Sequence, residues 1–196
     1  MNSVKPKLVL ASASPRRLDL LAQIGIVPDQ VLATDIDETP HRSELPAAYA
    51  RRMAHEKAVV AGGLRLPKDA IVLAGDTVVA RGRMILPKAE TEDEARHCLD
   101  LLSGRRHRVL GGIALRRADG RIVSRLVTSR VTMKRLSADE IDHYIATGDW
   151  QGKAGGYAIQ GPAAALIRHI DGSYSNIVGF SLYDVAAMLR GNGVLV

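Results

Sequence analysis

The stretch from Ala70 to Ala80 constrains the fold more than any other part of the sequence. It is the most apolar run in the chain, AIVLAGDTVVA, and it predicts a central strand buried on both faces. Such a strand needs other elements packed over each face, which favours an α/β fold. Asp76 interrupts the run, and a buried carboxylate is costly unless it is ion-paired, hydrogen-bonded or bound to a metal. Asp76 is therefore a candidate functional residue, with a structural, hydrogen-bonded role as the alternative. Gly75 before it indicates a bulge or a close approach of two backbones.

A second unusual stretch lies near the N-terminus. Residues 8–11 predict a short buried strand, and Ser14 followed by Pro15 predicts the start of a helix. Arg16 and Arg17 then fall in the first helical turn, where the helix dipole disfavours a cation by roughly 0.3–1 kcal/mol. Together with nearby serines and backbone N–H groups, the two arginines indicate an anion-binding site. The alternative is that both arginines point into water.

The remaining pattern alternates strands with amphipathic helices. We expect further helices from Ser43 or Glu44 to Gly62, from Thr91 to Ser103, from Ser137 to Gly148, and from Ser181 onward. We expect further strands at residues 27–33, 84–86, 107–117, 121–136 and 165–170, with a hairpin turn at Asp119-Gly120. Residues 152–161 predict a glycine-rich loop leading into a short strand, and residues 173–179 a second loop of small residues. The pattern predicts one mixed-sheet α/β domain over residues 1–196, with two lobes around a cleft.

Composition excludes several classes of protein. Of 196 residues, 46% are hydrophobic and only Cys98 is a cysteine, so no internal disulfide framework is possible and Cys98 is expected to pack in the core. No apolar segment approaches the roughly 18 residues of a membrane span, and the start of the sequence has no signal-peptide apolar region. We therefore expect a cytoplasmic protein without a membrane partner. The net charge of +6 suits nucleic acid or an anionic small substrate, but its arginine pairs have no aromatic residues between them, which makes nucleic acid the less favoured partner.

Two sets of charged residues lie beside apolar runs or glycine turns, where they could line a cleft. The cationic set is Arg16, Arg17, Lys57, Lys88 and Lys153, and the acidic set is Asp37, Glu38 and Asp76. A polyphosphate needs both kinds of group: cations for its oxygens and carboxylates for a divalent metal such as Mg²⁺ or Mn²⁺. Lys57 continues an apolar helix row, so it is either directed into a cleft or a snorkelling residue at its edge. The sequence contains no zinc spacing, Walker A motif, GxGxxG motif or GxSxG motif.

Several of these segments occur together in one known family. They are LASASPRR at residues 10–17, the Glu56-Lys57 helix, GDTVV at 75–79, KAGGYAIQG at 153–161 and GSYSNIVG at 172–179. In this order they resemble the Maf family of nucleoside triphosphate pyrophosphatases, and the resemblance covers nearly the whole chain. It implies a Maf/ITPase-like fold, a divalent metal, and hydrolysis of a nucleoside triphosphate to a monophosphate and pyrophosphate. It also implies a homodimer.

The resemblance also assigns roles to individual residues. Asp76 matches the proton acceptor and a metal contact, and Glu38 matches the acidic residue near the metal. Three residues match phosphate-binding positions: Ser12, Arg17 and Lys57. Three match positions that govern substrate choice: Arg16, Thr77 and Gln160. The sequence Ile159-Gln160-Gly161 is similar to the branch that acts on dTTP and UTP, since the branch that acts on 7-methyl-GTP typically has an acidic residue there.

The chain departs from the family at one lysine. The family commonly has Lys-Pro after the short strand, whereas this chain has Pro87-Lys88. Lys88 is therefore carried over as a fourth phosphate-binding residue displaced by one position. Three alternatives remain open at this stage: pyrophosphatase activity on 7-methyl-GTP or other modified nucleotides, a non-enzymatic role in cell division, and nucleic-acid binding.

Overall fold

A computed structural model describes residues 6–194 of the chain. Its elements are β1 (Leu8–Ala11), α1 (Pro15–Gln23), β2 (Gln30–Leu32), α2 (Pro46–Gly62), β3 (Ile71–Arg81), β4 (Met84–Leu86), β5 (Lys88–Ala89), α3 (Glu92–Leu102), β6 (Arg106–Arg116), β7 (Ile122–Met133), α4 (Ala138–Ala146), β8 (Lys153–Ala154), the 3₁₀ turn η1 (Pro162–Leu166), β9 (Ile167–Asp171), α5 (Tyr174–Val178) and α6 (Leu182–Arg190). The chain divides into two compact units, and β3, β6 and β7 contribute residues to both. The expected mixed-sheet α/β fold is confirmed.

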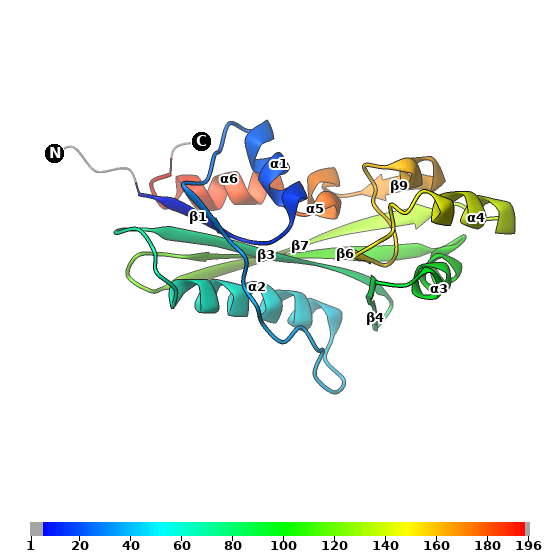
Figure 1. The fold of residues 1–196 in the computed structure, drawn as a ribbon, viewed down its shortest axis with the longest axis horizontal. Helices are drawn as coiled ribbons and strands as arrows, with labels where there is room; N and C mark the ends of the chain where they lie inside the picture. The colour runs from blue at the N-terminus through cyan, green and yellow to red at the C-terminus, as the bar shows by residue number, and fades with distance from the viewer. Residues whose placement is uncertain (1–5, 195–196) are drawn as a thin grey trace. The chain divides into compact units, whose positions relative to one another are not determined.

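The first unit comprises Met1–Asp76, Gly111–Val127 and Gly179–Val196. Its strands follow the order β2-β1-β3-β6-β7, with β1 parallel to both β2 and β3. Helix α2 lies on one face of β1 and β3, and helices α1 and α6 lie on the other (Figure 1). Alanines of α2 pack closely on β1, β3 and β6, and a Cβ on Gly112 would lie 2.1 Å from the Ala50 carbonyl oxygen. The central strand is thus covered on both faces, as its apolar sequence predicts.

The second unit comprises Thr77–Leu110 and Thr128–Val178. Here β4 pairs antiparallel with the end of β3, and β9 pairs antiparallel with the end of β7. A separate two-stranded pair, β5 with β8, aligns Lys88 with Ala154. Both capping boxes, at Thr91 and Ser137, form as expected, and Cys98 is fully buried in the core of this unit.

The structure corrects four expectations about elements. Residues 173–179 contain helix α5 (Tyr174–Val178) rather than only a loop, because Ser173 Oγ accepts the backbone N–H of Asn176 and so starts a helical turn. Residues 27–33 contain only the short β2, and α2 begins at Pro46 rather than near Ser43. The glycine-rich segment leads into turns and η1 rather than a strand, which delays β9 to Ile167.

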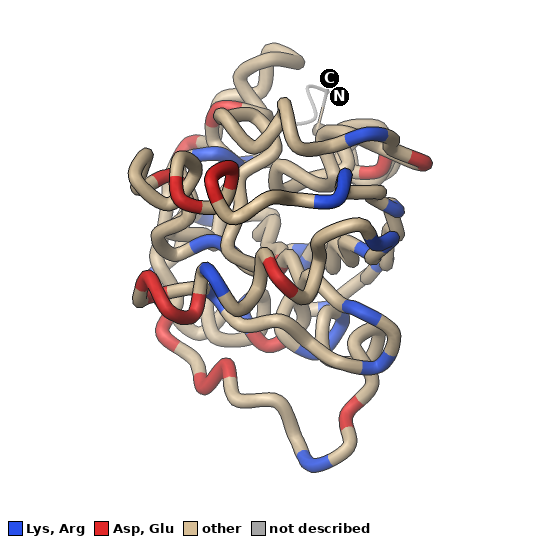
Figure 2. Tube along the Cα trace, turned by 90° about the vertical axis from the view of Figure 1, so that its right-hand side faces the viewer, with Lys and Arg blue, Asp and Glu red and all other residues tan. Residues whose placement is uncertain are grey.

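Charged residues of both signs are spread along the chain. Figure 2 shows lysine and arginine positions interspersed with aspartate and glutamate positions on the Cα trace. No helix within residues 6–194 is long and apolar enough to cross a membrane.

Candidate functional site

A buried ion pair lies at the end of the first unit's part of β3. The Lys57 ammonium donates to Asp76 Oδ1 at 2.7 Å, and the two side chains are only 9% and 7% exposed. Side chains alternate along a strand, so Asp76 points to the same face as Val72 and Ala74, which pack against α2. Lys57 comes from that helix. The snorkelling interpretation of Lys57 is therefore wrong, and Asp76 is stabilised by a full opposite charge.

Glu38 approaches the same lysine from the segment between β2 and α2. Its Oε1 lies 2.6 Å from Lys57 Nζ, and its side chain is 34% exposed. Helix α2 holds this segment in place, because the Tyr49 hydroxyl donates to the Glu38 carbonyl oxygen at 2.6 Å and Arg52 donates to the Thr39 carbonyl oxygen at 3.0 Å. Burial, and then the negative charges of Asp76 and Glu38, raise the pKa of Tyr49 to about 12. The segment thus presents a carboxylate to the buried pair from a fixed backbone.

Arg17 is buried at the start of α1. Its Nη1 donates to Ser12 Oγ at 2.9 Å, its Nε donates to the Gly179 carbonyl oxygen at 3.1 Å, and its guanidinium lies 5.2 Å from the centre of the Phe180 ring. Burial lowers the pKa of Arg17, and the carboxylate of Asp76 opposes that shift. Interpreting Arg17 as a surface residue is therefore wrong. The Ser14 side chain makes no capping hydrogen bond; instead the Ser14 N–H donates to Ser12 Oγ at 3.2 Å.

Gly75 allows the close approach that its place in β3 predicts. A Cβ at this position would lie 2.4 Å from the Phe180 ring and 3.0 Å from the Gly112 carbonyl oxygen. Because alternate residues of a strand face opposite ways, Gly75 faces Phe180 while its neighbour Asp76 faces α2. The missing side chain makes room for the ring that contacts Arg17.

The first unit brings together five of the residues singled out in the sequence. Ser12 contacts Arg17, and Lys57 contacts both Asp76 and Glu38. Arg16 lies next to them in α1 and is half-buried. Asp37 does not join them; it is exposed, and its carboxylate accepts the backbone N–H of Thr39 at 2.9 Å in a local turn.

The other singled-out residues belong to the second unit. Thr77 begins this unit's part of β3, Lys88 is an exposed residue of β5, and Lys153 donates to the Gln151 carbonyl oxygen at 2.9 Å from β8. Lys88, which lies one sequence position from the lysine of the family pattern, is thus part of a regular pair of strands.

Gln160 is exposed at the end of a tightly held segment of the second unit. The three residues before it, Tyr157 to Ile159, are buried. The hydroxyl of Tyr157 contacts His107 Nε2 at 2.8 Å, and the backbone N–H of Ala158 donates to the Tyr144 hydroxyl at 3.2 Å. The segment thus presents one exposed amide from an anchored backbone.

Sequence reasoning missed four residues of these arrangements. They are Tyr49, Tyr144, Phe180 and His107, none of which is among the candidate residues of the sequence. A tyrosine on a buried helix face is a usable signal, because its hydroxyl needs a hydrogen-bond partner when it is buried. Nothing local to Phe180 indicates that it lies against Arg17, which is more than 160 residues away in the sequence.

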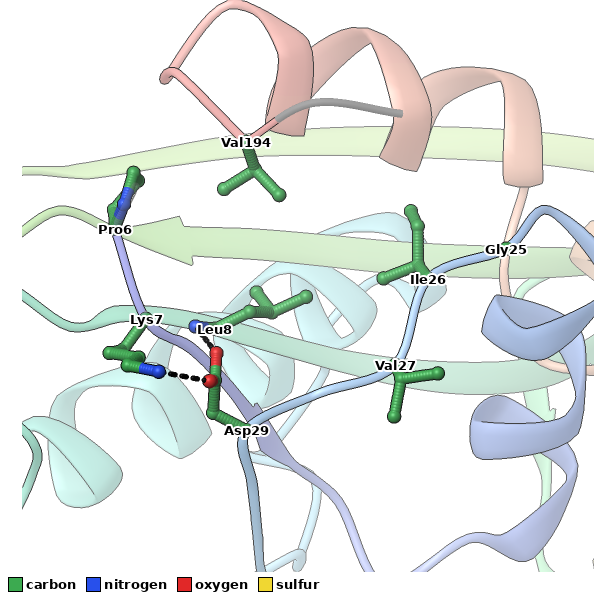
Figure 3. A pocket seen from close by; sticks show the side chains of 8 residues that line it. All are labelled: Pro6, Lys7, Leu8, Gly25, Ile26, Val27, Asp29 and Val194. Atoms are coloured by element: carbon green, nitrogen blue, oxygen red, sulfur yellow. Dashed lines mark hydrogen bonds and ion pairs between the residues drawn. The ribbon is translucent and has the colours of Figure 1, made fainter. Parts of the chain in front are cut away.

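A pocket of about 170 Å³ lies elsewhere in the first unit, at the start of β1 (Figure 3). Its lining includes the ion pair of Lys7 with Asp29, at 2.8 Å, and the side chains of Leu8 and Ile26. It contains none of the predicted site residues. The candidate site is instead at the opposite end of β1, beyond the carboxyl ends of parallel strands, where α/β proteins commonly bind ligands.

The fold is similar to that of a solved structure, and the sequence is similar to those of a known family. The structure of a HAM1 protein from Coxiella burnetii aligns with a TM-score of 0.51 at 15% identity, covering 95% of this chain and 99% of that one, so the two share an α/β fold. The Maf-like protein family matches residues 7–192. A protein of Paramagnetospirillum magneticum named dTTP/UTP pyrophosphatase is 62% identical over 95% of this chain and 97% of its own. A protein of the same name from Rhodospirillum rubrum is 59% identical over 95% of this chain and 88% of its own. The chain belongs to the Maf family.

Proposed function

We propose that this protein hydrolyses nucleoside triphosphates, with dTTP and UTP preferred, to a nucleoside monophosphate and pyrophosphate. The observation that carries the proposal is the buried carboxylate of Asp76, held by Lys57 in the unit that also buries Arg17. The name shared by relatives at 62% and 59% identity supports the choice of substrates. A role in clearing unwanted nucleotides from the cellular pool fits this activity.

In the proposed reaction Asp76 orients a water molecule and accepts its proton. The water oxygen forms a bond to the α-phosphorus, and the bond from that phosphorus to the oxygen bridging to the β-phosphate breaks. Pyrophosphate leaves with the electron pair of that bond. Ser12, Arg17, Lys57 and Lys88 contact phosphate oxygens in this proposal, and the cations among them oppose the negative charge of the leaving group.

The proposal includes a divalent cation, Mg²⁺ or Mn²⁺, held by Asp76 and Glu38. The donor set fits, because two carboxylates, the oxygen ligands that such a cation prefers, contact the same ammonium nitrogen and would both be available to it. Mg²⁺ is commonly held by one or two carboxylates, with substrate phosphates and water completing its shell. Within residues 6–194, no group of three histidine, cysteine, aspartate or glutamate side chains is placed to hold a metal, which agrees with a site that the substrate completes. Such a cation neutralises charge on the phosphates when bound.

Base selection is assigned to Arg16, Thr77 and Gln160. The amide of Gln160 offers both a donor and an acceptor to a pyrimidine edge, and its exposed position supports this role. We also propose that residues 1–196 act as one domain, that the protein is a homodimer, and that it works in the cytoplasm.

One assay tests the proposed function against its alternatives. The purified protein is incubated with a panel of nucleotides plus Mg²⁺ or Mn²⁺, and pyrophosphate and orthophosphate are measured separately. Pyrophosphate release that is fastest with dTTP and UTP supports the proposal. Fastest release from 7-methyl-GTP would show that the protein prefers the other class of substrate. Orthophosphate alone, or no release from any triphosphate, would contradict pyrophosphatase activity, and no release at all would favour the non-enzymatic role in cell division.

Nucleic-acid binding is tested by titration with DNA at several salt concentrations. Tight binding that weakens steeply with salt would support it. The interspersed charges and the burial of Arg17 and Lys57 favour a small anionic substrate instead.

A further inference from the structure

A single ammonium group is shared by the two carboxylates to which the proposed function gives the metal. Lys57 Nζ lies 2.7 Å from Asp76 Oδ1 and 2.6 Å from Glu38 Oε1. Lys57 and Asp76 are both nearly inaccessible to water, at 9% and 7% side-chain exposure. The lysine therefore occupies the position between the two acids that a bridging cation would need.

The balance of charge around Lys57 also links binding of a metal to binding of a triphosphate. The side chains of Lys57 and Arg17 supply two positive charges, and those of Asp76 and Glu38 supply two negative charges. A divalent cation added alone would leave these four side chains, three of them buried, with excess positive charge, in surroundings where like charges repel more strongly than in water. A triphosphate brings the negative charge that offsets both the metal and the displaced ammonium.

We propose that Lys57 acts as an exchangeable counter-cation of Asp76 and Glu38. It neutralises them in the substrate-free protein and must leave them for the phosphates when metal and nucleotide bind together. The two ligands are therefore coupled: the metal binds weakly to the protein alone and tightly with a triphosphate. This inference rests on the proposed function, and it adds a cause for the coupled binding of metal and nucleotide.

The test measures Mn²⁺ binding to the substrate-free protein by the electron paramagnetic resonance signal of free Mn²⁺, with no turnover involved. Lys57→Met removes the counter-cation and leaves two facing carboxylates, which a divalent cation can then compensate. We expect this variant to bind Mn²⁺ at least about tenfold more tightly than the wild type, within the usual range of coupling between sites. Adding Asp76→Asn to Lys57→Met should abolish the gain. Lys68→Met, which removes an exposed lysine of the same unit, should bind Mn²⁺ as the wild type does.

A second measurement follows the coupling itself. With a dTTP analogue whose α,β-bridging oxygen is replaced by methylene, the wild type should bind Mn²⁺ at least about tenfold more tightly than without it, beyond the binding of Mn²⁺ by the analogue alone. In Lys57→Met this gain should shrink, because the metal no longer has to displace an ammonium group.

Two results would overturn the inference: Lys57→Met binding Mn²⁺ no better than the wild type, or the wild type binding Mn²⁺ equally well with and without the analogue. If circular dichroism shows that Lys57→Met does not fold, Lys57→Gln takes its place under the same criteria. If neither variant folds, equal binding of Mn²⁺ by the wild type with and without the analogue would still overturn the inference. The pyrophosphate assay is independent of these outcomes. Pyrophosphate release by a wild type that shows no coupling would refute the inference and leave the proposed function standing.

Discussion

The two units of the molecule fix their candidate functional residues by opposite means. In the first unit, charged side chains are buried and hold one another, as Lys57 does between Asp76 and Glu38. In the second, neutral contacts anchor a buried segment, and Gln160 remains exposed at its end. A group expected to do charge chemistry is removed from water and must therefore be compensated by an opposite charge. A group expected to recognise a base has to remain accessible while its backbone is fixed.

The largest effect should come from the buried carboxylate. Asp76→Asn keeps the size of the side chain but removes the proton acceptor, so kcat for pyrophosphate release should fall at least about a hundredfold. Asp19→Asn, at an exposed position of α1, is the matched control and should leave kcat unchanged. Near-normal turnover by Asp76→Asn would remove Asp76 from the role and leave it a structural partner of Lys57.

The second unit should respond to acid through His107. This side chain is 2% exposed, and burial lowers its pKa to about 4 from an ordinary value of 6.5. Within residues 6–194 its Nδ1 has no hydrogen-bond partner, so a protonated ring would bury an unsatisfied donor. A lowered histidine pKa gives stability that is complete above about pH 6.5, because the unfolded state takes up the proton first as pH falls. We expect about 3 kcal/mol of unfolding free energy to be lost between pH 7 and pH 4.

Trp150 reports this loss, since it is the only tryptophan and is buried in the second unit. Urea unfolding followed by its fluorescence at several pH values measures the slope. His107→Gln should flatten the slope between pH 6.5 and pH 4. An unchanged slope in that variant would assign the acid sensitivity to other groups.

A smaller effect on stability should follow from filling the space beside β3. Gly75→Ala places a methyl group against the Phe180 ring and the Gly112 carbonyl oxygen, and should cost about 1–3 kcal/mol in urea unfolding. The ring must move, so Arg17 should also lose part of its support and KM should rise. Gly63→Ala is the control, because its Cβ would meet nothing closer than 3.5 Å. Equal stability of the two variants would show that the ring moves aside without cost.

The smallest effect should come from loosening the segment that carries Gln160. Tyr144→Phe removes the acceptor of the Ala158 N–H and should lower stability by about 1 kcal/mol. The ratio of kcat/KM for dTTP to kcat/KM for other triphosphates should also fall a few-fold, because the backbone that carries Gln160 is less well fixed. Tyr183→Phe, whose side chain is 82% exposed, should change neither quantity. Lower stability with unchanged discrimination would mean that the anchor is structural only.

The fold could be predicted from the sequence because its central signals are local. The apolar run of β3, the capping boxes at Thr91 and Ser137, and the turn at Gly120 each depend on neighbouring residues. Helix α5 was missed because a helix of five residues has no apolar period to detect. Ser173 at its start is also held by Ser129, which is 44 residues away in the sequence: Ser129 Oγ accepts the Ser173 N–H and donates to the Ser173 carbonyl oxygen.

The sequence indicates which residues belong to the candidate site better than it indicates which of them are in contact. Asp76 and Arg17 stand out because each is placed where elementary electrostatics disfavours it. That Lys57 reaches Asp76, or that Phe180 lies against Arg17, depends on the packing of elements far apart in the sequence. The catalytic and substrate-selecting roles of these residues stay predictions for the assays above.

The alternation of side chains along β3 also limits how this segment can vary in length. Gly75 serves one face of the strand and Asp76 the other, while the preceding residues are held in register with β1 from Leu8 to Ala11. Deleting or inserting one residue between Ala74 and Asp76 would turn the carboxylate toward the Phe180 side and away from Lys57. The segment should therefore accept substitutions far more readily than changes of length, and functional chains selected from a library of single-residue insertions should contain none at this point.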